Sequence, residues 1–270
     1  MQAARQARLD LIERWRGSLS HVLFAHTRDD VAEGFLMRLA RGAGVEGLSA
    51  MAARRKVHGF TVIRPCLDMG RAELRHYLKV LHGTWVDDPS NDDPAYDRAR
   101  MRRLLQILSD EGLGADVLSD AAARMRRARD ALTARAAHVW EDIGTEGSLN
   151  GQPTGEILLH RGGFDALERD TQLRLLSAAL MWVSGQGLRP RIGPLEELLD
   201  RLTAGGAGTL HGCEAVTERS EIRVFRELSA ITDIPQRDAC GLWDGRWSCD
   251  ARGLRPLGED GWRLLLPDHR

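Results

Sequence analysis

The stretch HVLFAHTRDDVAEGFLMRLARGAGVEGLSAM, residues 21–51, decides the fold class. It begins with an apolar run of strand length, His21–Ala25. Apolar residues then recur at helical spacing through Val31–Leu39 and predict one buried helix face. Thr27 is placed to be the N-cap of this helix, with Asp30 in the position of a capping-box acid. The stretch therefore predicts a strand that leads directly into a helix, an arrangement whose crevice binds ligands in α/β proteins.

Polar side chains share the opposite face of the predicted helix. At about 100° per residue, Asp30, Glu33, Met37 and Arg41 fall on this face. Two carboxylates one turn apart, close to His26, are suited to hold a cationic ligand. A capped surface helix with solvated acids explains the same pattern, so the residues alone leave both interpretations open.

The composition is that of an ordinary globular protein. The chain has 270 residues, of which 29% are charged and 43% hydrophobic, and its net charge is −1. This balance argues neither for nor against a nucleic-acid partner. Only Lys56 and Lys79 are lysines, so arginine carries nearly all positive charge. Arginine is the better bidentate partner for phosphate, although GC-rich codon usage also explains its excess.

The cysteines and the apolar runs exclude several classes of protein. Cys66, Cys213, Cys240 and Cys249 are far apart and form no C-x-x-C pair, which predicts neither a metal site nor a disulfide framework. We expect reduced thiols in a cytoplasmic protein. No run reaches the roughly 18 apolar residues of a membrane span, and no signal-peptide pattern is present, so no membrane association is expected.

Helices and strands alternate in the first part of the chain. Residues 2–16 read as a helix that begins without a cap, which suggests that sequence upstream of Met1 is missing. Thr61–Arg64 reads as a second strand, and Gly70–Leu81 as an amphipathic helix with Tyr77 and Leu81 among its inward residues. This alternation is typical of a mainly parallel α/β sheet.

An acidic turn and two arginine clusters follow. The turn, Asp87–Pro94, leads into a helical region, residues 99–142, which is interrupted at Gly112–Gly114. The arginines at or near the helix start are Arg98, Arg100, Arg102 and Arg103, and those further along are Arg124, Arg126, Arg127 and Arg129. They either bind phosphate groups or form a surface that the acids neutralise.

The last part of the chain reads as a small α+β region. Residues 144–155 are a linker by composition, because Gly, Ser, Asn and Pro are frequent there. The elements expected beyond it are a strand at Ile157–His160, helices at Asp165–Val183 and Pro190–Leu202, and a hairpin of Thr209–Thr217 with Ile222–Arg226. The domains predicted from these patterns cover residues 1–110, 111–145 (a helical connector), 146–235 and 236–270 (a tail).

Four motifs, in order, resemble those of the tRNA(Ile)-lysidine synthetase family of N-type PP-loop ATP pyrophosphatases. HTRDDVAEG is similar to the family's A-H-H-x-D-D-x-A-E-T, and RLARGAGVEGLSAM to its R-L-x-R-G-x-G-x-x-G-L-x-x-M. Arg64-Pro65 with GRAELRHYL resembles R-P-L-L…S-R-x-E-I-x-x-Y, and DDPSNDDPAYDRARMR resembles D-P-S-N-x-D…R-N-x-x-R. The resemblance is strong over residues 2–110 and looser in GTLHGCEAVTERSEIRVFRE.

The resemblance implies a fold, a reaction and its substrates. The fold is α/β: an incomplete PP-loop domain (adenine nucleotide alpha-hydrolase-like, Rossmann-like) with a parallel sheet, then a helical segment and a small α+β C-terminal domain. The reaction is an ATP-dependent ligation, with Mg²⁺ expected. ATP adenylates C2 of the wobble cytidine of tRNA(Ile) with a CAU anticodon, and free L-lysine displaces AMP. The family implies a monomer or a homodimer.

The same resemblance assigns roles to individual residues. The catalytic residues are His26, Asp30 and Arg98, and Asp30 with Glu33 binds lysine. The residues that bind ATP or its phosphates are Arg41, Gly42, Arg98, Arg5 and Arg8. The residues that bind tRNA are Arg100, Arg102, Arg103, Arg124 and Arg127. No metal ligand is implied.

The chain departs from the family pattern at several points. The S-G-G-x-D-S loop that cradles ATP phosphates is absent and is expected upstream of Met1. Thr27, Gly34 and Ala99 replace a His, a Thr and an Asn of the motifs, which alters the polarity of the site. A tRNA thiolase of the same superfamily is an alternative, but such enzymes commonly use paired cysteines. A non-catalytic RNA-binding fragment is the other alternative.

Overall fold

The computed structural model describes residues 2–49, 51–57, 59–87, 97–150, 152–231, 241–243, 247–250 and 253–256. The chain divides into two compact units, Met1–Arg129 and Asp130–Arg270. The division falls within one helix, α6. In the part of the chain described, no helix has the length and apolar character that a membrane crossing requires.

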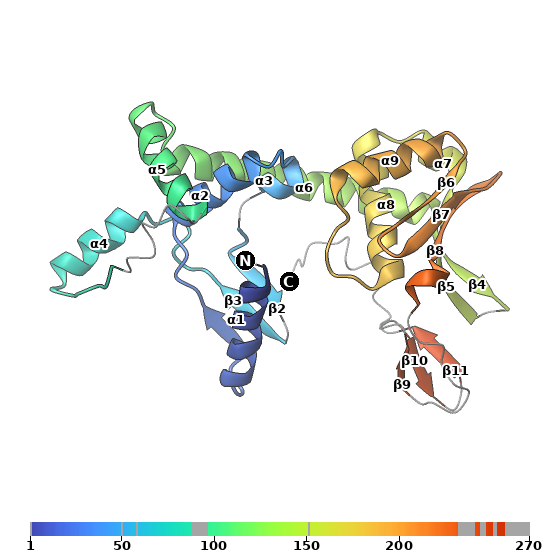
Figure 1. Cartoon of the computed structure of the whole chain (residues 1–270), viewed down its shortest axis with the longest axis horizontal. Coiled ribbons are helices and arrows are strands. Elements are labelled where there is room, and N and C mark those ends of the chain that lie inside the picture. The colour runs from blue at the N-terminus through green and yellow to red at the C-terminus, as the bar shows by residue number, and fades with distance from the viewer. Residues whose placement is uncertain are drawn as a thin grey trace. The chain divides into compact units, whose positions relative to one another are not determined.

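The first unit alternates helices and strands (Figure 1). Its elements are α1 (Gln2–Trp15), β1 (His21–Leu23), α2 (Arg28–Leu39), α3 (Val45–Leu48), β2 (Arg54–Val57), β3 (Phe60–Ile63), α4 (Arg71–Val80), α5 (Asp97–Asp110) and the first half of α6 (Ala115–Ile143).

The sheet of the first unit has the order β1-β3-β2. β1 and β3 are parallel, with His21 opposite Thr61, which confirms the predicted parallel pair. Parallel strands need a crossover connection, and α2 lies in it. β2, with the sequence RRKV, pairs antiparallel to β3 and was not predicted, since its sequence does not alternate between apolar and polar residues.

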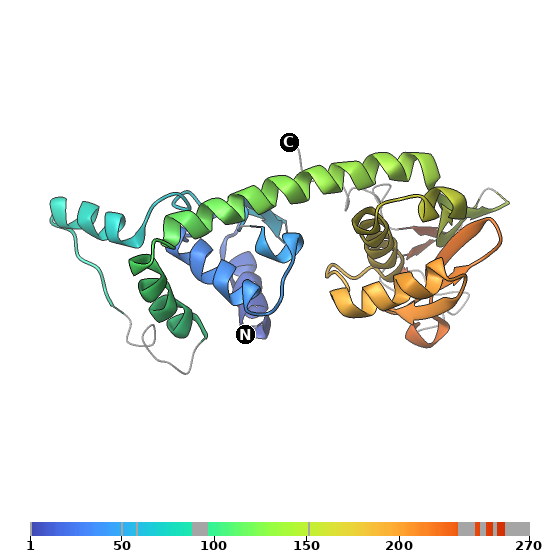
Figure 2. The same ribbon diagram turned by 90° about the horizontal axis from the view of Figure 1, so that it is seen from above.

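The predicted apolar stripe of α2 is the centre of the first unit's larger core. Val31, Ala32, Phe35 and Leu36 are buried against side chains of α5 and α6. Figure 2 shows α2 and the first half of α6 side by side. A second, smaller core joins α1 to the sheet through Leu9, Phe60 and Val62.

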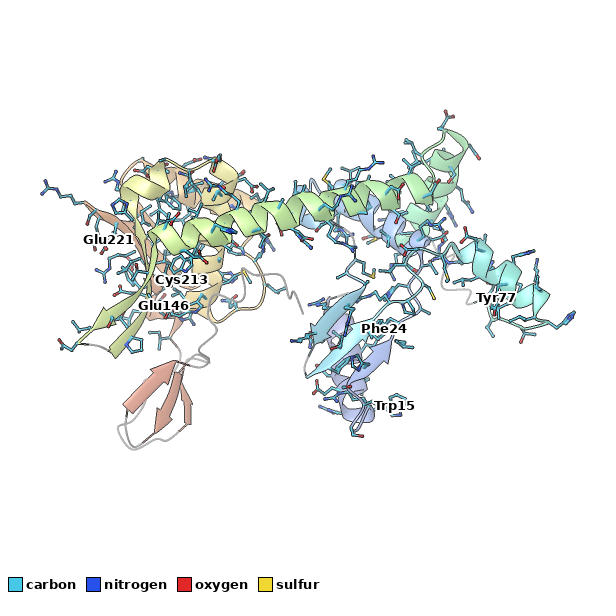
Figure 3. The ribbon with its side chains drawn as sticks, turned by 180° about the vertical axis from the view of Figure 1, so that it is seen from behind. Trp15, Phe24, Tyr77, Glu146, Cys213 and Glu221 are labelled. Carbon is cyan, nitrogen blue, oxygen red and sulfur yellow. The ribbon has the colours of Figure 1, made fainter. Side chains whose placement is uncertain are left out.

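Helix α4 confirms the predicted helix but not its buried face. Tyr77 and Leu81 were expected to point inward, yet they are 60% and 56% exposed, and Figure 3 shows Tyr77 on α4. No residue of α4 is buried. The amphipathic pattern was therefore misleading here, because contacts at the first turn of α4, described below, hold the helix without a buried apolar face.

The second unit is an antiparallel sheet with helices. Its elements after α6 are β4 (Gly144–Leu149), β5 (Gln152–His160), α7 (Arg161–Asp165), α8 (Arg169–Ser184), α9 (Ile192–Thr203), β6 (Ala207–Leu210), β7 (Cys213–Thr217), β8 (Glu221–Arg226), the 3-10 turn η2 (Leu228–Ala230), β9 (Gly241–Trp243), β10 (Trp247–Asp250) and β11 (Gly253–Pro256). The larger sheet has the order β4-β5-β8-β7-β6, and β9 to β11 form a separate sheet. The chain is thus an α/β unit followed by an α+β unit.

The second unit has a core of its own, to which α8 and α9 contribute Leu175, Leu176, Leu180, Leu199 and Leu202. The predicted linker at residues 144–155 is wrong, since these residues form β4 and most of β5. The predicted helix from Asp165 to Val183 corresponds to α8, which begins only at Arg169, and Asp165 is the last residue of α7. The predicted strand Thr209–Thr217 is divided into β6 and β7.

A two-residue turn divides β6 from β7. His211 has φ 62° and Gly212 φ 71°. Positive φ at both central residues defines the type I′ turn, whose twist suits a hairpin. This turn is the reason why one apolar run of the sequence becomes two strands.

Candidate active site

Asp30 fixes the start of α2 and faces the end of β1. Its Oδ2 accepts hydrogen bonds from the backbone N–H and the hydroxyl of Thr27, both at 2.9 Å. The predicted acid of the capping box is therefore in place. Its carboxylate also complements the positive end of the helix dipole.

A pocket of about 400 Å³ opens beside this capped helix start. It is lined by residues of α1, of the loop after β1, of the first turn of α2 and of the first turn of α5: Arg8, Ile12, Phe24, Ala25, His26, Asp30 and Arg98. Of the residues predicted from the sequence, it brings together His26, Asp30, Arg98 and Arg8. Two guanidinium groups, a carboxylate and an imidazole thus meet at the carboxyl end of a parallel strand, where α/β sheets bind ligands.

The imidazole of His26 lies against an aromatic ring. The ring centroids of His26 and Phe24 are 5.6 Å apart with an interplanar angle of 36°. The guanidinium carbon of Arg64 lies 6.0 Å from the centroid of the same Phe24 ring. Figure 3 shows Phe24 beside the sheet of the first unit. A polar residue and an aromatic residue therefore share one wall of the pocket.

Glu33 lies away from this pocket. Its side chain is fully buried, and its Oε1 accepts from Arg71 Nη2 at 3.2 Å and from Arg102 Nε at 2.9 Å. This face of α2 was predicted to be polar and open, but arginines of α4 and α5 cover it at Glu33. The second oxygen, Oε2, is buried without a hydrogen-bond partner among the described residues.

The neighbouring acid, Asp29, caps a different helix from the one that Asp30 caps. Its Oδ2 accepts from the backbone N–H of Arg71 at 2.7 Å, at the start of α4. Arg71 is therefore held at its backbone by Asp29 and at its side chain by Glu33. Nothing in the sequence indicated that two adjacent acids would cap two different helices.

The other predicted ATP-binding residues are not in the pocket lining. Arg41 lies beyond the C-terminus of α2, is exposed, and pairs with Asp97 of α5 at 3.2 Å. Gly42 follows it with φ 70°. The side chain of Arg5 lies outside the described part of the chain.

The predicted tRNA-binding arginines have varied surroundings. Arg100 pairs with Asp97, and the Nε of Arg102 contacts Glu33. Arg103, Arg124 and Arg127 are exposed. The D-P-S-N block, residues 88–91, lies outside the described residues.

Some pocket residues were missed by the sequence analysis. Ile12, Phe24 and Ala25 line it together with the predicted polar residues. The only available signal for Phe24 was its place at the end of the strand run. No signal distinguished Ile12 from other apolar residues of the first helix.

Part of the chain matches a known protein family, and the chain is similar to several named relatives. Residues 1–108 match the PP-loop domain family. The chain is 38% identical over 278 aligned residues to a tRNA(Ile)-lysidine synthase of Ruegeria pomeroyi. This alignment covers 99% of this chain and 64% of that protein. A protein of the same name from Wolbachia pipientis is 31% identical, over 97% of this chain and 61% of the relative. A third, from Bradyrhizobium diazoefficiens, is 39% identical over 74% of this chain and 56% of the relative.

Proposed function

We propose that this chain, whose residues 1–108 match the PP-loop domain family, is the ligase that attaches lysine to the wobble cytidine of tRNA(Ile). The observation that carries the proposal is the pocket that joins His26, Asp30 and Arg98. The similarity to tRNA(Ile)-lysidine synthases over nearly the whole chain supports it. The chain spans 64% and 61% of the first two relatives, so the activity of a whole protein of this kind is part of the proposal.

The proposed reaction has two steps. The C2 oxygen of the cytidine attacks the α-phosphorus of ATP and releases pyrophosphate. The ε-amine of lysine, after losing a proton, then attacks C2, and AMP leaves with the C2 oxygen. The first step needs cations near the phosphates, and the second needs a site that binds an ammonium group and accepts its proton.

Each polar residue of the pocket has a role in this proposal. The guanidinium groups of Arg98 and Arg8 stabilise negative charge on the phosphate groups. The carboxylate of Asp30 binds the lysine ammonium, and His26, beside it in the lining, accepts a proton from this ammonium before the amine attacks. The pocket accelerates the reaction mainly by holding the reacting groups close together in a fixed geometry, so that the reaction does not depend on their random encounter.

Glu33 enters the proposal through Oε2 alone, because arginines hold Oε1. A lysine contact at Oε2 requires the surrounding side chains to open, since Glu33 is 0% exposed. Arg41 and Gly42 remain proposed residues of the nucleotide side. Among the described residues no group of three or more His, Cys, Asp or Glu could hold a metal ion. Mg²⁺ would therefore be held mainly by the ATP phosphates, as is usual for this ion.

The test is lysine transfer to tRNA. Protein expressed from its complete reading frame is incubated with ATP, labelled lysine and a tRNA(Ile) transcript with a CAU anticodon. We expect labelled RNA, with one AMP and one pyrophosphate formed per lysine attached, and no label on a transcript whose wobble base is uridine. RNA binding without any AMP formation would refute the ligase and support the non-catalytic alternative.

A variant separates the lysine role from folding. Asp30→Asn keeps an oxygen that accepts the cap hydrogen bonds and removes the charge. We expect a higher KM for lysine with an unchanged KM for ATP. An equal rise in both KM values would contradict the role of Asp30 as the ammonium-binding group. The thiolase alternative is not favoured, because the cysteines whose side chains are described, Cys66 and Cys213, lie in different units and neither lines the pocket.

A further inference from the structure

A second cavity of the first unit is lined by three arginines. It has a volume of about 370 Å³ and lies at the carboxyl end of β3, beside Ile63. Arg54 of β2, Arg64 after β3 and Arg126 of α6 line it, and Asp68 is the only acid among the described residues of its lining. Three positive charges and one negative charge leave the lining with a net charge of +2. Such a lining is suited to an anion.

Two of these arginines are fixed in place by the backbone. Arg64 is 6% exposed, and its Nη1 donates to the carbonyl of Ala52 at 2.7 Å. Arg126 donates through Nη2 to the carbonyl of Met51, also at 2.7 Å. Because both guanidinium groups are held by adjacent carbonyls, their charges are placed at the cavity wall before any ligand arrives. A buried charge also acts through a medium less polarisable than water, so its field in the cavity is stronger.

The cavity is connected to the candidate active site through an aromatic ring. Arg64, in the cavity lining, lies over the ring of Phe24 at 6.0 Å, and Phe24 lies against His26 at 5.6 Å. Phe24 and His26 line the first pocket, and Arg64 lines the second. The two binding spaces therefore occupy the carboxyl ends of the two parallel strands, β1 and β3.

The surroundings of the cavity favour a polyanion over a single small anion. On β2, Lys56 lies two residues after Arg54 and therefore on the same face of the strand, and it is exposed. On α6, the exposed Arg124 and Arg127 flank Arg126 in sequence. Positive charge thus extends outside the cavity along both elements, as expected where a chain of phosphates passes across a protein surface.

We propose that this cavity binds a backbone phosphate of the RNA substrate, with Arg54, Arg64 and Arg126 as its guanidinium donors. The apolar side chains of Val31 and Leu67 in the same lining pack against the adjoining ribose or base. The inference rests on the proposed function only in taking RNA as the substrate. It assigns to these arginines a contact with RNA backbone, which positions the substrate while the first pocket carries out the chemistry.

Two neighbouring arginines provide a matched test. Arg54 and Arg55 are successive residues of β2 and both are exposed, but their side chains point to opposite faces of the strand and only Arg54 lines the cavity. Arg54→Ala and Arg55→Ala therefore make the same change of charge at nearly the same place. Affinity for a fluorescent CAU anticodon stem–loop is measured by anisotropy without ATP or lysine, at several salt concentrations, and circular dichroism verifies that both variants fold.

We expect Arg54→Ala to weaken RNA binding about 3- to 10-fold and to reduce the salt slope by about 0.7–1, the value of one phosphate contact. Arg55→Ala should change affinity less than about twofold. Equal effects of the two substitutions would overturn the proposal, because general surface charge would then explain them. Binding of inorganic phosphate or ATP that is lost in Arg54→Ala, with unchanged RNA affinity, would also overturn it and assign the cavity to a free anion.

The assay distinguishes this inference from the proposed ligase. If Arg54→Ala weakens RNA binding but the protein transfers no lysine, the ligase proposal fails and the phosphate site stands. If lysine transfer occurs and Arg54→Ala binds RNA as tightly as the parent protein, the phosphate site fails and the ligase stands.

Discussion

Replacing Glu33 by glutamine tests whether one buried carboxylate holds three helices of the first unit together. Glu33 of α2 accepts hydrogen bonds from Arg71 of α4 and Arg102 of α5. The substitution keeps the shape of the side chain and removes its charge, so both arginines lose their anionic partner. We expect a large loss of stability, since α4 has no buried residue of its own to hold it.

The magnitude follows from the burial of the three side chains. Removing one partner of a fully buried ion pair costs about 3–5 kcal/mol. Here the acid is 0% exposed but the arginine side chains are 30% and 25% exposed, so water partly replaces the lost partner. We therefore expect a loss of about 2–3 kcal/mol in the free energy of unfolding. For a unit of this size that corresponds to a fall in Tm of roughly 5–15 °C.

The assay is urea unfolding followed by circular dichroism, with Glu13→Gln as the control. Glu13 of α1 pairs at 3.4 Å with Arg16, which follows the helix, and the two side chains are 36% and 16% exposed. Its substitution should cost at most about 1 kcal/mol, because a single pair that water reaches contributes little. A loss below about 1 kcal/mol for Glu33→Gln would refute the reasoning, since the buried carboxylate would then not join the three helices.

Three further outcomes are expected. Asp30→Ala removes the acceptor of both Thr27 hydrogen bonds and should cost about 1 kcal/mol in urea unfolding, and an unchanged midpoint would contradict the capping role. Burial lowers the pKa of His211, so the unfolded chain binds its proton more readily and stability should be lost as pH falls below about 6.5. His211→Asn, which tolerates the positive φ, should therefore show a smaller fall in Tm between pH 7.5 and 5.5 than the parent protein, and identical falls would contradict the assignment. Phe164→Ala, at a fully buried position, should cost about 3–5 kcal/mol in urea unfolding, whereas Leu188→Ala, at a position 63% exposed, should cost far less, and similar losses would contradict the assigned core.

The strand–helix segment of residues 21–39 could be predicted because its sequence signals are local. An apolar run, a cap and a helical stripe all lie within residues 21–39, and the structure follows them. The first pocket was partly predictable for the same reason, since His26 and Asp30 belong to that strand–helix segment. Arg98 was assigned only through the resemblance, because no local rule relates it to residues about seventy positions earlier.

The errors arose where distant residues decide the structure. Glu33 reads as a surface acid on a helical wheel, and only the arginines of α4 and α5 bury it. Residues 144–155 read as a linker because glycine is frequent there. In the structure Gly144 lies so close to the ring of Trp140 that a Cβ would overlap it at 1.8 Å, and a Cβ on Gly147 would meet Glu156 at 2.2 Å. These glycines permit a tightly packed hairpin, and composition alone does not separate this use from a linker.

The cap at the start of α2 also has a consequence for ligand affinity. Oδ2 of Asp30 is already held by two hydrogen bonds from Thr27, so the side chain has a single orientation before a substrate enters the pocket. Ordering a mobile side chain on binding costs about 0.5–1.5 kcal/mol. A cation that approaches Oδ1 meets a carboxylate that has already lost this rotational entropy during folding. The free energy that forms the helix thus also makes the pocket pre-organised for its ligand.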